Sequence, residues 1–423
     1  MNQQHPLPSA SSSMADWSQL PKDLLQLISS KLDSEFYQLR FRSVCSSWRS
    51  SVPKNHHHHL TLPSHLPTPS DSNNLHHSKS ITFPLSKRTI FLITPPTNHH
   101  HHHQQTLNNN PWLIKIGPDS RDRTRLWNPL SRDKQLSIYL PQVINFNEHR
   151  VIDLGREFVI GNFNEYSSLY MEKVIVLDAD MWGGKERCSV LFTIHISGKI
   201  AFFRCGDERW TIVPEMPSPF DDVCVFKGRP VAVDGTGRTV ALRPDLSLDL
   251  VAEPVFGGDK KFLVESDGEL LLVDKYLSCF RDGNFVDHTD VPYGDVNVVN
   301  FDVDVDVDDD DDDGEIFRIG SERAVRFDVF RLDEKEKKWV EVRNLGDMVL
   351  FLGEECAFSA SASDLCIGNG NCVIFRDYVL NDFHSTEVGN RVFHLDQRRI
   401  SPLSDFPIYS KLFWPPPEWV GLH

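Results

Sequence analysis

Apolar residues follow two different spacings along the chain, and the first of them predicts a short helical part near the N-terminus. Leu24, Ile28 and Leu32 recur every four residues. A second set, spaced by three or four residues, consists of Phe41, Val44, Cys45 and Trp48. Each set forms a stripe on one side of a helix. Because about thirty-five residues bury only a small core, we expect part of this apolar surface to be a docking surface.

The second spacing begins at Pro111 and predicts strands. Runs of four to eight residues alternate or stay apolar, and Gly, Asp, Asn or Pro bounds each run. Turn pairs such as Ser197-Gly198 and Asp267-Gly268 separate neighbouring runs. The predicted strands are 112–116, 173–177, 189–196, 199–204, 210–213, 223–227, 229–233, 239–243, 261–265, 269–273, 326–332, 338–342 and 349–352. The chain is therefore expected to be mostly β, with an all-β domain over 111–423.

The length of this β domain favours a ring of four-stranded blades over a sandwich. Residues 199–215 and 327–345 form a loose repeat, in which an apolar strand, a charged turn, a tryptophan and a second apolar strand follow one another. We expect Trp210 and Trp339 to pack between blades of a β-propeller-like domain. The repeat is too diverged to count the blades, and six is the number we prefer.

Composition divides the rest of the chain. Residues 1–16 are polar and Ser-rich, which predicts a disordered tail before the helical unit at 17–53. Residues 54–110 hold histidine tracts, prolines and asparagines, which predicts a low-complexity linker with one possible strand at 81–93. Histidine tracts can bind divalent metals, but no carboxylate or cysteine completes a defined site, so a spacer is the preferred interpretation.

Charge and cysteine usage limit the function. The formal net charge is −16, and nine Asp in 302–313 account for more than half of it, which leaves −7 for the rest. No Lys/Arg cluster suggests nucleic acid or anionic lipid as a partner. The sequence has neither a secretory leader nor an apolar run of membrane-spanning length. Eight cysteines without a Cys-x-x-Cys pair are typical of buried thiols, which indicates the nucleus or cytoplasm.

Motifs that would carry chemistry are incomplete. Asp309, Asp311, Asp313 and Gly314 fit the first half of a calcium loop, but Gly320 stands where the bidentate Glu is needed. We therefore interpret 302–314 as a solvated acidic loop. The glycines in 233–240 lack the Lys-Ser/Thr of a phosphate loop and predict a hairpin turn. The sequence indicates no catalytic group, no metal site and no cofactor.

The helical unit resembles the F-box, a short module that binds the Skp-type adaptor of cullin-based ubiquitin ligases. Leu20-Pro21 opens the motif, Leu24, Leu25 and Ile28 match its first helix, and Val44-Cys45-x-x-Trp48-Arg49 matches its Val-Cys-x-x-Trp signature. Residues 125–132 (RLWNPLSR), 370–377 (GNCVIFRD) and 398–419 resemble plant F-box proteins of the Skp-interacting-partner type. The C-terminal half of that family is known only as a domain of unknown function.

The resemblance implies a non-catalytic substrate receptor. Residues 17–53 would bind the Skp-type adaptor and through it a cullin, while the β domain would hold an unknown substrate protein for ubiquitination and proteasomal degradation. The residues implied in adaptor binding, either by direct contact or by holding the helices that make it, are Leu20, Pro21, Leu24, Ile28, Leu32, Leu39, Val44, Cys45 and Trp48. One alternative is a scaffold that binds the adaptor outside a working ligase. Another is a propeller enzyme with carboxylates or histidines converging at the mouth of the ring.

Overall fold

The fold is described from a computed structural model of the chain. The described residues are 16–51 without 33–34, the short strands at 66–67 and 82–83, and most of 85–420. The larger gaps in that last range are 96–109, 137–148, 161–172, 183–188, 214–218, 288–322 and 381–385. The chain divides into two compact units, residues 1–59 and 60–423, and each is described by itself.

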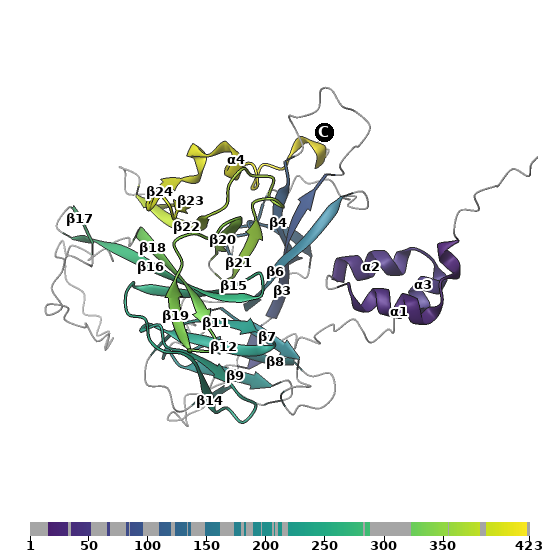
Figure 1. The fold of residues 1–423 in the computed structure, drawn as a ribbon, viewed down its shortest axis with the longest axis horizontal. Coiled ribbons are helices and arrows are strands. Elements are labelled where there is room, and N and C mark those ends of the chain that lie inside the picture. The colour runs from purple at the N-terminus through teal and green to yellow at the C-terminus, as the bar shows by residue number, and fades with distance from the viewer. Residues whose placement is uncertain are drawn as a thin grey trace, which may run out of the picture. The chain divides into compact units, whose positions relative to one another are not determined.

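The first unit is helical, as its apolar spacing predicts. It contains the 3-10 turn η1 (Trp17–Gln19) and the helices α1 (Lys22–Ser30), α2 (Glu35–Ser43) and α3 (Ser46–Ser51) (Figure 1). Leu25 and Phe41 form its buried core, and Leu20, Leu32 and Trp48 pack against them while staying half-buried. A core of this size leaves other apolar residues of the unit at the surface.

The second unit consists mainly of five β-sheets whose strands pair mostly antiparallel, and each sheet is a blade (Figure 1). Blade 1 contains β3 (Leu85–Thr94), β4 (Trp112–Pro118), β5 (Thr124–Trp127) and β6 (Arg150–Ile160). Blade 2 contains β7 (Ile175–Asp178), β8 (Ser189–Ile194), β9 (Ile200–Arg204) and β10 (Thr211–Ile212). Blade 3 contains β11 (Phe220–Phe226), β12 (Arg229–Asp234), β13 (Thr239–Leu242) and β14 (Leu248–Ala252).

The last two blades have five strands each. Blade 4 contains β15 (Lys260–Ser266), β16 (Glu269–Arg281), β17 (Asn284–Asp287), β18 (Arg323–Asp333) and β19 (Lys338–Glu341). Blade 5 contains β20 (Met348–Leu352), β21 (Ala357–Ser361), β22 (Cys372–Leu380), β23 (Thr386–His394) and β24 (Arg399–Pro402). The short strands β1 (Leu66–Pro67) and β2 (Thr82–Phe83) pair apart from the blades, and η5 (Leu403–Asp405), α4 (Pro407–Ser410) and η6 (Glu418–Val420) follow blade 5.

The blades close into a five-bladed β-propeller. Its inner strands β6, β7, β11, β15 and β21 contact one another in cyclic order. A separate apolar cluster fills each of the five gaps between neighbouring blades. The preferred number of six blades is therefore wrong. Two of the sheets take a fifth strand and long segments separate other strands, so the same length of chain forms fewer blades.

The two tryptophans of the sequence repeat pack between blades, which confirms their predicted role. Trp210 lies in the cluster between blades 1 and 2, with Leu85 and Phe158 from blade 1 and its ring 5.4 Å from that of Phe203. Trp339 lies in the cluster between blades 3 and 4. Each tryptophan thus fills an inter-blade gap that small residues would leave empty.

The first strand of the ring corrects a predicted boundary. β3 lies inside the predicted linker 54–110, yet it pairs with both β4 and β6. Ile90 and Leu92 of β3 are fully buried in the cluster that joins blade 1 to blade 5. Residues 85–93 of the possible strand at 81–93 therefore belong to an internal strand of blade 1. Its apolar alternation was hidden by the polar and histidine-rich stretches on both sides.

Backbone and indole hydrogen bonds join the two ends of the ring. The backbone N–H of Leu113 donates to the carbonyl oxygen of Leu412 at 2.8 Å. The indole N–H of Trp419 donates to the carbonyl oxygen of Asn110 at 2.9 Å. The segment after blade 5 thus holds the start of β4 and ties the end of the domain to blade 1.

Candidate functional site

The helical unit has an exposed apolar face along α1. Leu24, Leu27 and Ile28 expose 47%, 57% and 40% of their surface. Positions separated by three and four residues lie on one side of a helix, so these three side chains form one face. Val44, between α2 and α3, and Trp17 of η1 are exposed as well. A helical unit that leaves five large apolar side chains in water has the character of a docking surface.

The predicted site residues fall into two groups in the structure. Pro21, Leu24, Ile28 and Val44 are exposed and can contact a partner directly. The half-buried group consists of Leu20, Leu32, Cys45 and Trp48. Leu39 lies in α2, and its side chain is outside the described part of the chain. Leu27 and Trp17 are exposed too but were not among the predicted site residues, although the three-residue step from Leu24 to Leu27 could have indicated the first of them.

Trp48 holds the unit together. Its ring lies 4.5 Å from the ring of Phe41, centroid to centroid. Its indole N–H donates to the carbonyl oxygen of Trp17 at 3.0 Å, which fixes η1 against α3. The amide of Gln38 donates to the carbonyl oxygen of Leu32 at 2.9 Å and ties α2 to the end of α1. These contacts position the exposed face of α1.

Buried charges in the propeller are paired within the fold. The Nζ of Lys115 contacts Glu157 and donates to the carbonyl oxygen of Ser131 at 2.7 Å. Burial raises the pKa of the Glu157 carboxyl, and the nearby Lys115 opposes that shift. Lys173 donates to Asp222 at 3.0 Å, and Asp222 accepts from the backbone N–H of Leu263 at 2.8 Å. These carboxylates stabilise contacts within and between blades.

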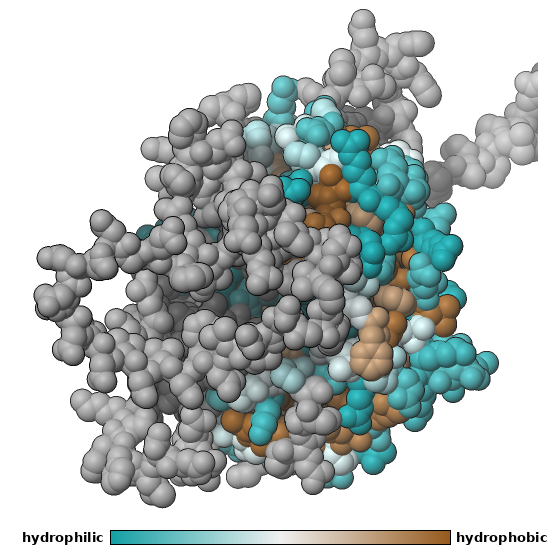
Figure 2. All heavy atoms as spheres, turned by 90° about the vertical axis from the view of Figure 1, so that its left-hand side faces the viewer, coloured by the Kyte–Doolittle hydropathy of each residue, from teal (hydrophilic) through white to brown (hydrophobic). Residues whose placement is uncertain are grey.

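Among the residues that the structure describes, no group of three or more His, Cys, Asp or Glu could hold a metal ion. The acidic loop predicted at 302–314 and the histidine tracts lie outside the described residues. Within the described part, no helix has the length and hydropathy to cross a membrane. In the coloured part of the face shown in Figure 2, hydrophobic residues form small groups separated by hydrophilic ones.

Two known domain families match the sequence and agree with this geometry. The F-box domain matches residues 17–60, which include the exposed face of α1. The KIB1-4 beta-propeller matches residues 82–394, including β3. The chain belongs to the plant F-box proteins with a KIB1-4 β-propeller. The start of the propeller match at residue 82 agrees with the corrected boundary.

Curated relatives of this F-box protein match it along nearly its whole length. F-box protein SKIP23 from Arabidopsis thaliana is 42% identical over 97% of this chain and 97% of its own. F-box protein At2g17036 from the same plant is 33% identical over 96% of this chain and 95% of its own. Putative F-box protein At5g60060 is 30% identical over 91% and 94%. The pairing of an F-box with this propeller is consistent with a non-catalytic receptor.

Proposed function

We propose that this chain is the substrate-recognition subunit of an SCF-type (Skp–cullin–F-box) ubiquitin ligase. The observation that supports it is the exposed apolar face formed by Leu24, Leu27 and Ile28 in the F-box domain. The Skp-type adaptor would cover this face, while the propeller holds a substrate protein. The chain performs no bond chemistry in this proposal. It raises the effective concentration of substrate lysines near the ubiquitin donor.

The proposal includes the compartment in which this would occur. Cys224, Cys356 and Cys372 are free thiols in the buried interior of the propeller. Free buried thiols agree with a reducing compartment, so we place the protein in the nucleus, the cytoplasm or both.

Adaptor binding is tested by a pull-down with purified Skp-type adaptor. Leu24→Asp with Ile28→Asp should reduce capture by at least about tenfold, because two charges would be buried in an apolar interface. Both side chains are exposed, so the variant should keep the helical circular dichroism of the parent. The control is Ser47→Asp with Ser50→Asp, which adds the same charge at exposed positions of α3. Undiminished capture by the first variant would overturn the proposal.

The rival proposal is a scaffold that binds the adaptor outside a ligase. Purification of the tagged protein from plant cells with the proteasome inhibited separates the two. A working receptor should bring down a cullin together with the adaptor, and proteins enriched with it should accumulate when the proteasome is blocked. Recovery of the adaptor with no cullin would favour the scaffold.

A further inference from the structure

A groove of about 310 Å³ lies between blades 3 and 4 of the propeller. Its apolar lining comes from both blades and consists of Phe226, Val231, Leu250, Val251 and Leu332. Phe226 and Val231 are buried and form the base, whereas the other three are half-buried. The groove can therefore accept an apolar side chain from outside.

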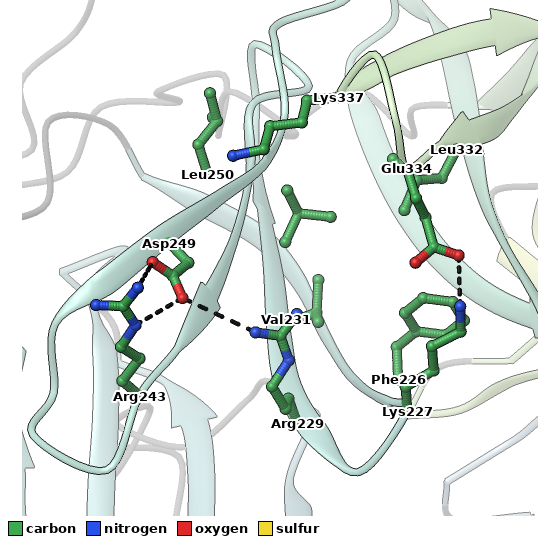
Figure 3. Close-up of a pocket in the computed structure, with 11 residues that line it drawn as sticks. Phe226, Lys227, Arg229, Val231, Arg243, Asp249, Leu250, Leu332, Glu334 and Lys337 are labelled. Carbon is green, nitrogen blue, oxygen red and sulfur yellow. Dashed lines mark hydrogen bonds and ion pairs between the residues drawn. The ribbon is translucent and has the colours of Figure 1, made fainter.

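Charged residues surround this apolar base (Figure 3). Lys227, Arg229 and Arg243 come from blade 3, and Lys337 comes from the turn between β18 and β19 in blade 4. The acidic residues of the lining are Asp249 and Glu334. Four basic and two acidic side chains leave an excess of two positive charges, in a chain whose net charge is −16.

The ion pairs show where the excess charge lies. Lys227 pairs with Glu334. Asp249 accepts from the Nε of Arg243 at 2.6 Å and is also 3.8 Å from a terminal nitrogen of Arg229. The Asp249 carboxylate thus pairs with two guanidinium groups, and its longer contact is the one to Arg229. Among the described residues, Lys337 forms no ion pair.

Backbone geometry holds the two lysines at the rim. Lys227 and Lys337 have φ angles of 49° and 50°, a region that residues other than Gly and Asn adopt uncommonly. The carbonyl oxygen of Lys337 accepts a hydrogen bond of 2.8 Å from the backbone N–H of Glu253, which ties its turn to blade 3. The two turns thus fix the points at which both lysine side chains leave the backbone beside the groove.

We propose that this groove binds an acidic segment of the substrate protein. An apolar side chain of that segment would pack on Leu250 and Leu332, and its flanking carboxylates would pair with Arg229 and Lys337. The inference deepens the proposed function, on which it rests, by naming the chemistry of the substrate. Arginine beside an apolar base is a common arrangement at protein interfaces.

The test uses the full-length protein and a short fluorescein-labelled peptide of alternating Glu and Leu, with binding followed by fluorescence anisotropy. Arg229→Glu with Lys337→Glu should weaken binding by about tenfold or more, because like charges would face each other. The control Arg399→Glu with Lys411→Glu makes the same charge change away from the groove. Arg399 is exposed on the edge strand of blade 5, and Lys411 is exposed in the segment after blade 5. The control should bind like the parent, and Arg229→Lys with Lys337→Arg should keep most of the affinity.

Two further peptides test the two halves of the site. A peptide of alternating Lys and Leu should not bind, and one of alternating Glu and Ser should bind more weakly than the Glu/Leu peptide. The inference is overturned if the parent protein fails to bind the Glu/Leu peptide. It is also overturned if the Arg229/Lys337 charge reversal leaves binding unchanged, or if the Glu/Ser peptide binds equally well.

Measuring adaptor capture by the Arg229/Lys337 charge-reversal variant distinguishes a failure of the groove proposal from a failure of the proposed function. The thermal melt of this variant should match that of the parent, since both side chains lie at the rim of the groove. Normal adaptor capture together with unchanged peptide binding would reject the groove alone. Adaptor capture lost in the Leu24/Ile28 variant together with unaltered peptide binding supports two separate sites.

Discussion

The indole N–H of Trp339 donates a hydrogen bond of 3.0 Å to the carbonyl oxygen of Gly237, which lies 102 residues earlier in the chain. The bond joins blade 4 to blade 3. Gly237 has a φ of +85°, and a Cβ there would lie 2.7 Å from the carbonyl oxygen of Val255. The turn after β12 thus needs glycine for its conformation and for its close approach to the chain.

Trp339→Phe should lower the free energy of unfolding by about 1–3 kcal/mol, because it leaves the Gly237 carbonyl oxygen without this donor. Trp339→Ala should cost about 3–5 kcal/mol, since it also opens a cavity between the blades. Urea unfolding followed by tryptophan fluorescence and circular dichroism measures both. Phe256→Ala is the control, because Phe256 is 78% exposed. Equal stability of Trp339→Phe and the parent would show that the hydrogen bond contributes nothing.

A fragment of residues 111–423 should fail to fold cooperatively, although the composition of the sequence placed the start of the β domain there. It lacks β3, which pairs with β4 on one side and β6 on the other. It also removes Ile90 and Leu92 from the cluster that closes the ring. A fragment of residues 80–423 should fold. Thermal melting followed by circular dichroism compares the two, and a sharp transition in the shorter fragment would contradict the central role of β3.

Local alternation was enough to predict the strands whose neighbours in sequence are also their neighbours in the sheet. β8, β9, β11, β12 and β13 belong to such hairpins, and tight turns separate them. The strands of blade 5 were harder to predict from the sequence. β20 pairs in parallel with β22, and β21 lies on the other side of β20 as the innermost strand. A pairing that skips a strand leaves no short turn signal in the sequence.

Helical spacing alone predicts part of the candidate site. The i, i+4 step identified Leu24 and Ile28, which the structure places in one exposed face. The same spacing cannot tell a residue that contacts a partner from one that holds the helices, so Trp48, which packs on Phe41, was predicted in the same set. The groove between blades 3 and 4 could not be predicted, because Arg229 and Lys337 line one groove only when the two blades pack.

The stability of the protein should depend on pH through Asp274, which pairs with Lys261 at 2.8 Å in the interior of blade 4. Burial raises the pKa of Asp274 from 3.8 to about 6, against the hydrogen bond and charge of Lys261, which lower it. The folded state therefore binds this proton more tightly than the unfolded state does. The contribution of the group to stability is largest below about pH 4 and is lost as pH rises through about 6.

Asp274→Asn removes this titration and keeps an oxygen that can accept from Lys261. The stability of the variant relative to the parent should therefore rise by up to about 3 kcal/mol between pH 4 and pH 7. Urea unfolding of both proteins at several pH values within this range measures the difference. A difference that stays constant over the range would mean that Asp274 titrates near its ordinary pKa in the folded protein.

The rates at which the cysteines of the folded protein react with a thiol reagent should show how the gaps between blades open. Burial raises the pKa of Cys224, Cys356 and Cys372 to about 12 each, whereas Cys366 is exposed. Only the thiolate reacts with iodoacetamide. At pH 8 the three buried thiols should therefore react far more slowly than Cys366, and their labelling should require opening of the packed blades.

Mass spectrometry of peptides from the labelled protein gives the rate at each of these positions. In urea above the unfolding midpoint, the four rates should become similar, because burial no longer separates them. Trp339→Ala is the informative variant: Cys224 shares a cluster with Trp339, whereas Cys356 and Cys372 lie in the cluster between blades 5 and 1. If gaps open one at a time, labelling of Cys224 alone should accelerate in this variant. Equal acceleration at all three buried thiols would instead mean that the ring opens as a single cooperative unit.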